Sequence, residues 1–301
     1  MAPPEPAAGG VVRGRFAPSP SGPLHFGSIV TALGSFLSAR AQGGEWLVRI
    51  ENIDPPREVP GAADGILRDL ERLGLTWDGP VVRQADRRAA YAAALAGLVE
   101  RGLAYPCRCS RRDVGNGPYP GTCRDRPPGP AAVRVWRLRV AAGEESILDR
   151  IRGRFGQKLA ETCGDFVIQG ADGWPTYHLA VVVDDAWQGI TEIVRGGDLL
   201  DSAPRQRWLQ HCLAYPEPAY AHLPLAIDTD GLKLSKQTRA HPVAGLAPDR
   251  LIDAALRFLN HTPPDVLAGA PASDLLRWAT ANWSLARVPR ALAVAAPALA
   301  G

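Results

Sequence analysis

Strand and helix patterns alternate near the start of the chain, and this order constrains the fold more than any other feature of the sequence. Residues 11–17 predict a short strand, and proline and glycine break the chain over residues 18–22. From about Ser28, apolar residues recur every three or four positions until a glycine pair at 43–44, which is the spacing of a helix. Residues 45–51 (EWLVRIE) predict a second strand. A strand, a helix and a strand in this order form a βαβ unit, so we expect an α/β fold with a doubly wound parallel sheet.

The same alternation continues through most of the chain. We expect helices at 62–73, 86–101 and 204–213, strands at 132–140, 166–168, 190–194 and 223–227, and a further apolar run at 179–183. Residues 107–130 break the pattern, because Cys, Arg, Gly and Pro dominate there and no period survives. We interpret this segment as an irregular insertion into the α/β domain.

Composition excludes some classes of protein and leaves others open. The chain has 301 residues, 46% of them hydrophobic, and no run approaches the roughly 18 apolar residues that a membrane span needs. Its first residues lack the basic and apolar regions of a signal peptide, which predicts a disordered tail and a cytoplasmic protein. The net charge of +3 is too small to predict nucleic-acid binding by itself. Five arginines could still form a local patch for an RNA end, or could belong to a solvated surface loop: Arg108, Arg111, Arg112, Arg124 and Arg126.

A loop rich in proline and glycine joins the first predicted strand to the first predicted helix. Its sequence, PSPSGPLHFGS, covers residues 18–28. A doubly wound sheet binds its ligand at such a junction, outside the carboxyl end of a strand. Gly27 would let a nucleotide approach the backbone closely, and His25 with the first N–H groups of the helix would face a phosphate. Neither GxGxxG nor a Walker lysine loop is present, which disfavours a dinucleotide site or a P-loop.

A second candidate motif, KLSKQ at residues 233–237, lies in a polar loop after the last predicted strand. The 34 basic residues include only three lysines, and two of these, Lys233 and Lys236, belong to the motif. In a chain that prefers arginine so strongly, a lysine is expected where a compact, flexible ammonium must follow a moving phosphate. The alternative is a solvated surface turn.

Three of the five cysteines lie close together, at positions 107, 109 and 123. A chain without an export signal is expected to keep its thiols reduced, so this cluster suggests a metal more than disulfides. Zinc prefers four tetrahedral ligands, and three thiolates leave one position for Asp113, Asp125 or water. The alternative is three reduced cysteines in a loop. The CxC spacing is tighter than that of most zinc sites, and a Gly/Pro-rich segment of this kind needs a metal to order it.

Together these motifs resemble the signatures of the class I aminoacyl-tRNA synthetases. The stretch RFAPSPSGPLHFGS resembles their HIGH motif, and KLSKQ resembles their KMSKS loop. Three further blocks resemble the glutamyl subgroup: RIENIDPPRE at 49–58, GWPTYHLAVVVDD at 173–185 and ITEIVRGGDLLDSAPRQ at 190–206. The resemblance runs from about Arg13 to Gln237, and it implies a class I Rossmann-type catalytic domain that activates an amino acid with ATP.

Little sequence follows the KMSKS-like loop, where a full glutamyl-tRNA synthetase carries a large anticodon-binding region. This and the HFG form of the first motif resemble the glutamyl-queuosine tRNA-Asp synthetases, which activate glutamate without tRNA and attach it to queuosine in the anticodon of tRNA-Asp. The implied organisation is a disordered tail at 1–10, a catalytic domain at 11–240 with a cysteine and zinc insertion at 105–140, and a helical region at 241–301 without an anticodon-binding domain.

The charges of glutamate agree with this resemblance. A selective pocket needs fixed cations for two carboxylates and an anion for one ammonium. Arg15 and Arg195, each at the end of a predicted strand, suit the carboxylates, and Glu51 suits the ammonium. For each residue alone, the alternative is an ordinary surface ion pair. The resemblance implies that the amino-acid site consists of Arg15, Phe16, Ala17, Pro18, Ser19, Glu51, Tyr177 and Arg195.

The resemblance also implies the remaining groups of the site. ATP with Mg²⁺ would lie against His25, Gly27, Lys233, Ser235 and Lys236, with His25 and Lys236 as the catalytic residues. A structural Zn²⁺ would be held by Cys107, Cys109, Tyr119 and Cys123. The implied partners are L-glutamate, ATP and tRNA-Asp, and a monomer is the default. The alternatives are a shortened conventional glutamyl-tRNA synthetase, a nucleotidylyltransferase of the same fold, and a non-catalytic paralogue that only binds amino acid or RNA.

Overall fold

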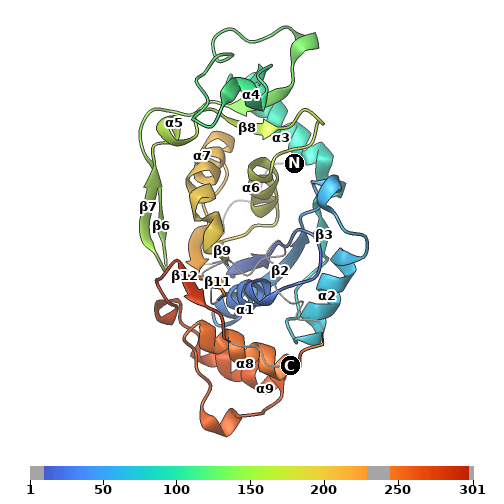
Figure 1. The fold of residues 1–301 in the computed structure, drawn as a ribbon, viewed down its shortest axis with the longest axis vertical. Helices are drawn as coiled ribbons and strands as arrows, with labels where there is room; N and C mark the ends of the chain where they lie inside the picture. The colour runs from blue at the N-terminus through green and yellow to red at the C-terminus, as the bar shows by residue number, and fades with distance from the viewer. Residues whose placement is uncertain (1–9, 229–244, 298–301) are drawn as a thin grey trace.

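The computed structural model of the protein describes residues 10–228 and 245–297. Its centre is formed by parallel strands, with α1 (Phe26–Arg40) crossing between β1 (Arg13–Phe16) and β2 (Glu45–Ile50), which pair in parallel. β2 continues in parallel to the short β3 (Val82–Arg83). The expected βαβ unit and the α/β class are therefore confirmed (Figure 1).

A second group of strands lies beside the first. Its order is β7 (Gly153–Gln157), β6 (Glu145–Asp149), β10 (Ala219–Leu223) and β9 (Glu192–Gly196). β6, β10 and β9 pair in parallel, and only the edge strand β7 is antiparallel. The amide of Thr191 donates to the carbonyl of Arg13 at 3.0 Å, so β9 lies next to β1. The carboxyl ends of β1, β2 and β9 therefore meet at one edge.

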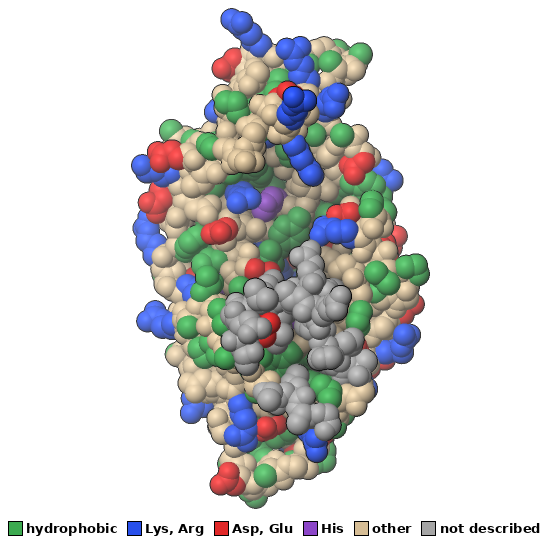
Figure 2. Space-filling model, viewed as in Figure 1, with side chains coloured by type: hydrophobic (Ala, Val, Ile, Leu, Met, Phe, Trp, Pro, Cys, Tyr) green, Lys and Arg blue, Asp and Glu red, His purple; other side chains and the backbone are tan. Residues whose placement is uncertain are grey.

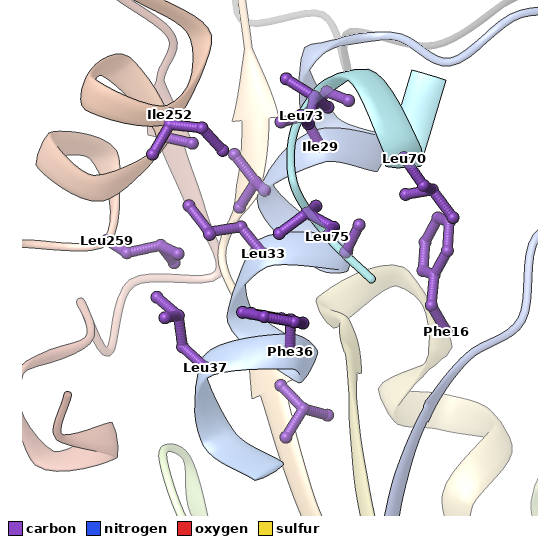
Figure 3. Packing of buried hydrophobic residues seen from close by; sticks show 14 of the residues in the cluster. Phe16, Ile29, Leu33, Phe36, Leu37, Leu70, Leu73, Leu75, Ile252 and Leu259 are labelled. Carbon is purple, nitrogen blue, oxygen red and sulfur yellow. The ribbon is translucent and has the colours of Figure 1, made fainter. Parts of the chain in front are cut away.

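The larger hydrophobic core surrounds α1. Ile29, Leu33 and Leu37 of this helix are fully buried, and Figure 3 shows them between residues of α2 (Ala62–Arg72) and of α8 (Pro248–Phe258). α9 (Ala272–Asn282) packs against both α1 and α8. On the opposite side the helix lies so close to β10 that a Cβ on Gly34 would come within 2.6 Å of Leu223. The helices that follow residue 240 thus complete the core under the central strands.

A second core supports the part of the chain that includes the insertion. It is formed by α3 (Arg88–Glu100), α6 (Tyr177–Trp187) and α7 (Ala203–Leu213). These helices pack with an antiparallel sheet of β4 (Ala104–Cys107), β5 (Val135–Leu138) and β8 (Phe166–Gln169), near the top of Figure 1. The apolar run 179–183 lies inside α6, where both sides of the helix are covered. The remaining short helices are α4 (Arg111–Val114) and α5 (Leu159–Thr162), with 3₁₀ turns at Pro55–Arg57, Gln84–Arg87, Pro130–Ala132, Gly197–Ser202, Asp265–Leu267 and Leu285–Arg287.

Two predicted strands differ from the structure, and one hairpin was missed. The strand expected at 223–227 is split by Pro224, which has no N–H to donate, and β11 (Leu225–Ile227) pairs instead with β12 (Ala293–Ala295). The strand expected at 132–140 is shorter, because its start forms a 3₁₀ turn. The β6–β7 hairpin was not predicted at all. No helix within the described ranges combines the length and apolar composition that crossing a membrane requires.

Candidate active site

A pocket with a volume of about 590 Å³ opens where β1, β2 and β9 end. Its lining includes each predicted amino-acid residue and both predicted ATP residues that lie in the described ranges: Arg15, Phe16, Ala17, Pro18, Ser19, His25, Gly27, Glu51, Tyr177 and Arg195. Lys233, Ser235 and Lys236 lie outside the described residues. A larger hollow between α1, α2 and α9 contains none of these side chains. Segments far apart in sequence are thus brought to one place, at the edge of the sheet where ligands of such folds bind.

His25 caps the N-terminus of α1. Its Nδ1 accepts a hydrogen bond from the amide of Ser28 at 3.3 Å, so the proton of the neutral ring is on Nε2. The next residue, Phe26, is buried and packs edge-on against Phe258 of α8 with ring centroids 5.7 Å apart. The aromatic residue in the HFG motif therefore anchors the helix start in the core. His25 and the first N–H groups of α1 form a donor surface suited to an anion.

Arg15 is held by a buried network of opposite charges. Its Nε and Nη2 donate to the two carboxylate oxygens of Asp185 at 3.2 and 3.3 Å. Arg49 contacts the same carboxylate at 2.8 Å and Glu51 at 3.3 Å. Asp184 adds a contact of 2.6 Å to Arg87. Because the network contains three arginines and three acids, it is electrically balanced without any ligand.

The pKa values of Glu51 and Asp185 are shifted in opposite directions. Burial raises the pKa of Glu51 from 4.5 to about 6, although Arg49 and Arg15 oppose the shift. Burial alone would also raise the pKa of Asp185, but Arg15 and Arg49 outweigh it and hold that pKa below its usual value. Asp185 is therefore the permanent counter-ion of the arginines, whereas Glu51 is the acid whose charge an incoming cation would stabilise.

Arg195 enters the pocket from β9 with most of its donors already used. Its Nε donates to Nε2 of His222 at 2.9 Å, and Nη1 donates to Oε1 of Gln206 at 2.7 Å. Nη2 reaches the carbonyl of Leu199 at 3.2 Å, and the hydroxyl of Tyr177 lies 3.5 Å from Nη1. Since a guanidinium has five N–H donors, about one remains for a ligand. Arg195 is thus fixed in orientation before any substrate binds.

The sequence did not identify Asp185, Gln206 or His222 as parts of the site. Asp184 and Asp185 end the apolar run of α6, and two adjacent acids after so apolar a segment were a usable signal. Gln206 and His222 carried no comparable signal, because an isolated glutamine or histidine is common in any chain.

The cysteines at 107, 109 and 123 form a second polar cluster, in the insertion. Their sulfurs all lie within 4.8 Å of one another, and those of Cys109 and Cys123 are 3.7 Å apart. The hydroxyl of Tyr119 lies 3.3 Å from the sulfur of Cys107 and 3.6 Å from that of Cys109. In a tetrahedral zinc site with bonds of about 2.3 Å, sulfurs are separated by about 3.8 Å. The four side chains therefore have the donor chemistry and the spacing that a tetrahedral metal requires.

The other candidate fourth ligands are engaged elsewhere. Asp113 accepts from the amide and the hydroxyl of Ser110, both at 2.8 Å, where it caps α4. Asp125 is exposed and lies 3.6 Å from Arg139. Arg137 is buried beside the cluster, donating to the sulfur of Cys107 at 3.3 Å with its guanidinium 3.7 Å from the ring centroid of Tyr119. Arg137 supplies one positive charge next to four groups that become anionic on binding a metal.

Comparison with known proteins agrees with this geometry. The family described as "tRNA synthetases class I (E and Q), catalytic domain" matches residues 11–115 and 124–246. The glutamyl-Q tRNA(Asp) synthetase of Dechloromonas aromatica is 53% identical, covering 95% of this chain and 98% of that protein. The enzyme of the same name from Ectopseudomonas mendocina is 52% identical, with 94% and 96% covered.

A solved structure shows the same fold. The glutamate tRNA ligase of Elizabethkingia meningosepticum, determined in complex with its amino acid, superposes with a TM-score of 0.82 at 26% identity, covering 96% of this chain and 68% of that protein. The match in fold and the near full-length similarity lead to one family. The chain belongs to the class I tRNA synthetases of the glutamate and glutamine type and, among them, to the glutamyl-Q tRNA(Asp) synthetases.

Proposed function

We propose that this ligase activates L-glutamate with ATP in the absence of tRNA and transfers the glutamyl group to queuosine in the anticodon of tRNA-Asp. The observation that carries the proposal is the pocket at the ends of β1, β2 and β9, where Arg15, Arg195 and the ionisable Glu51 face one cavity. The names of the most similar relatives support the acceptor. The cytoplasm, where tRNA is modified, is the corresponding compartment, and a monomer is the proposed state.

Glutamate binding follows from the charges of the pocket. Arg15 and Arg195 bind the two carboxylates, since each guanidinium is fixed by its own partners and presents its remaining donors to the cavity. Glu51 binds the ammonium. Tyr177, whose pKa burial raises, stays a phenol and contributes a hydrogen bond. Phe16, Ala17, Pro18 and Ser19 form the adjoining wall.

The first chemical step needs alignment more than covalent help. The α-carboxylate of glutamate attacks the α-phosphorus of ATP, a bond to the β-phosphate oxygen breaks, and glutamyl-adenylate and pyrophosphate form. Bringing the two anions together is the main difficulty, and fixed positive groups reduce it. Mg²⁺, when bound with ATP, neutralises part of the phosphate charge. His25, Gly27 and the start of α1 hold the nucleotide, and Lys233, Ser235 and Lys236 are assigned to its phosphates.

The cysteine cluster is proposed to hold a structural zinc ion. Cys107, Cys109, Tyr119 and Cys123 would be its ligands, and a bound ion would tie β4 (Ala104–Cys107) to the irregular segment that follows. A segment so rich in glycine and proline buries little apolar area of its own, so metal binding supplies the free energy that orders it. The cluster is part of the insertion 105–140 within the proposed catalytic domain 11–240, which the helical region 241–301 completes. The tail expected at 1–10 lies, except for its last residue, outside the described residues.

The insertion is also the proposed contact for RNA. Residues 107–134 contain six arginines and two acids, a net charge of +4, whereas the whole chain has a net charge of only +3. The remainder of the chain is therefore close to neutral, and Figure 2 shows basic side chains gathered at this end. We call the exposed arginines of this segment the arginine tip: Arg108, Arg111, Arg112, Arg126 and Arg134. Among the residues that the structure describes, no ion pair involves any of them. An unpaired basic surface of this kind is suited to a phosphate backbone.

Glutamate-dependent ATP–pyrophosphate exchange without tRNA is the decisive experiment, with aspartate and glutamine as control amino acids. We expect exchange with glutamate alone, followed by transfer of labelled glutamate to tRNA-Asp that carries queuosine but not to the same tRNA without it. Exchange that requires tRNA-Glu would show a shortened conventional synthetase. Exchange with no amino acid would show a nucleotidylyltransferase, and ATP binding without exchange would show a binding protein.

A further inference from the structure

Three polar residues form a line across three adjacent strands and end at the pocket. Asp149 lies on β6, His222 on β10 and Arg195 on β9. His222 and Arg195 are direct partners in the strand register. Nδ1 of His222 is 2.6 Å from Oδ2 of Asp149, and its Nε2 is 2.9 Å from Nε of Arg195. All three side chains are at most 3% exposed, so water does not substitute for any of these contacts.

The chemistry of the three groups allows only one arrangement of protons. A guanidinium has no acceptor, so Nε2 of His222 must accept from Arg195. The single proton of the ring is then on Nδ1, where it is donated to Asp149. The other carboxylate oxygen of Asp149 accepts from the amides of Ile151 and Arg152, at 3.0 and 2.8 Å, which fixes the carboxylate itself. Burial lowers the pKa of His222, which keeps the ring in this neutral form.

We infer that Asp149 and His222 are positioning residues for glutamate: the carboxylate fixes the tautomer of the imidazole, and the imidazole fixes the plane in which Arg195 meets the substrate. This inference rests on the proposed function, because it concerns the use of Arg195 in glutamate binding. Gln206 and Leu199 hold the terminal nitrogens of Arg195, and within the described ranges His222 alone holds its Nε. Without that contact the guanidinium keeps its acceptors at the terminal nitrogens, but its plane is fixed less tightly. A carboxylate bound by a guanidinium of fixed plane loses affinity when that plane is free.

Two substitutions at one position separate this role from a structural one. In His222→Gln the side-chain oxygen can take the place of Nε2 and accept from Arg195, while the contact to Asp149 is lost. In His222→Asn the side-chain amide can still donate to Asp149, while Arg195 loses its acceptor. A third variant, Asp149→Asn, keeps its backbone contacts but presents an amide to Nδ1 of His222. The ring must then carry its proton on Nε2, which points a donor at the donor of Arg195.

The test is glutamate-dependent exchange with full steady-state kinetics, together with thermal melting of each variant. We expect His222→Asn and Asp149→Asn to raise the KM for glutamate by about ten- to a hundredfold, with the KM for ATP within about twofold of the wild type. His222→Gln should keep the KM for glutamate within about threefold of the wild type, although its melting temperature is no higher than that of His222→Asn. This dissociation of KM from stability is what a merely structural role would not produce.

Two results would overturn the inference. If His222→Gln and His222→Asn raise the KM for glutamate equally, or in proportion to their loss of thermal stability, the histidine serves packing alone. If Asp149→Asn leaves that KM unchanged, the tautomer has no influence on Arg195. Both results require that the wild-type protein catalyses glutamate-dependent ATP–pyrophosphate exchange. If the wild type shows no exchange, the proposed function is rejected, and this inference is rejected with it.

Discussion

The two polar clusters of this molecule reach charge balance in different ways. The network behind the pocket contains three arginines and three acids, which pair with one another: Arg15, Arg49, Arg87, Glu51, Asp184 and Asp185. The cluster in the insertion contains three thiols and a phenol, and Arg137 is in contact with it and offers one positive charge. The first is complete without a ligand, whereas the second has donor groups whose full use requires a cation.

This difference separates binding from folding. A pocket whose arginines are already oriented can bind a small dicarboxylate without the entropic cost of ordering them, which favours affinity and selectivity. A cluster that waits for a metal couples local folding to metal binding. Substitutions in the balanced network should therefore change glutamate activation, and only the central counter-ion should also change stability. Changes in the cysteine cluster should instead alter the order of the insertion.

Removal of the central counter-ion should produce the largest effect. Asp185→Asn leaves Arg15 and Arg49 buried with one acid fewer, and breaking a buried ion pair in this way costs about 3–5 kcal/mol of unfolding free energy. Urea unfolding monitored by circular dichroism measures the loss. The matched control is Asp253→Asn, which removes an acid from an exposed pair with Arg257 and should cost less than about 1 kcal/mol. Equal losses in the two variants would show that the network is not held together by its own charges.

Neutralising the acid that faces the pocket should affect function without affecting the fold. Glu51→Gln removes the partner of the substrate ammonium, while Arg49 keeps Asp185 at 2.8 Å and Gln188 at 2.6 Å. We expect kcat/KM for glutamate to fall by about a hundredfold, as for a charged hydrogen bond worth about 3 kcal/mol. The melting temperature should change by less than about 4 °C. Glu45→Gln on the same strand, which affects only an exposed pair with Arg13, is the control and should leave both quantities unchanged.

Loss of the metal should change the order of the insertion while leaving glutamate activation nearly unchanged. Cys109→Ser, or treatment with a chelator, is expected to make residues 105–140 sensitive to proteolysis and to release about one zinc per chain. Exchange without tRNA should stay within about threefold of the wild type, because the insertion does not line the pocket. Cys163→Ser, a cysteine outside the cluster, is the control. If exchange and melting collapse together in Cys109→Ser, the two clusters are not independent.

What the sequence could predict depended on how local each signal was. β1, α1 and β2 were predictable because their apolar spacing is contained within each element, and Arg15 and Glu51 followed because they stand where strands end. Asp185 was missed because its contact with Arg15 joins residues 170 positions apart. The hairpin β6–β7 was missed because the usual alternation is inverted in β6, where Leu148 is 77% exposed and Asp149 is buried. Asp149 faces inward to contact His222, so the buried polar contact removes the apolar alternation by which this strand would have been predicted.

Substitutions in the arginine tip should have a smaller effect, and only on the binding of tRNA. Replacing Arg111 and Arg112 together by alanine is expected to weaken binding of the tRNA-Asp anticodon arm by about tenfold. It should also reduce the slope of log K against log salt by about one for each lost phosphate contact. The control replaces Arg257 and Arg277, which belong to α8 and α9 at the opposite end of the molecule, with the same change in net charge. Equal losses in both variants would mean that binding depends on net charge and not on the tip.

The smallest effect concerns pH, and it separates the two consequences of burying Glu51. Because burial raises its pKa to about 6, the folded protein holds this proton more tightly than the unfolded chain does, and the group makes folding less favourable as pH rises from 4.5 to 6. Substrate binding has the opposite sign, since only ionised Glu51 pairs with the ammonium. We expect kcat/KM for glutamate to be about half of its plateau at pH 6 and to fall about tenfold for each unit below that. Glu51→Gln should abolish this acidic limb. If the limb persists in that variant, another group controls binding, and the balanced network does not include the acid that recognises the substrate.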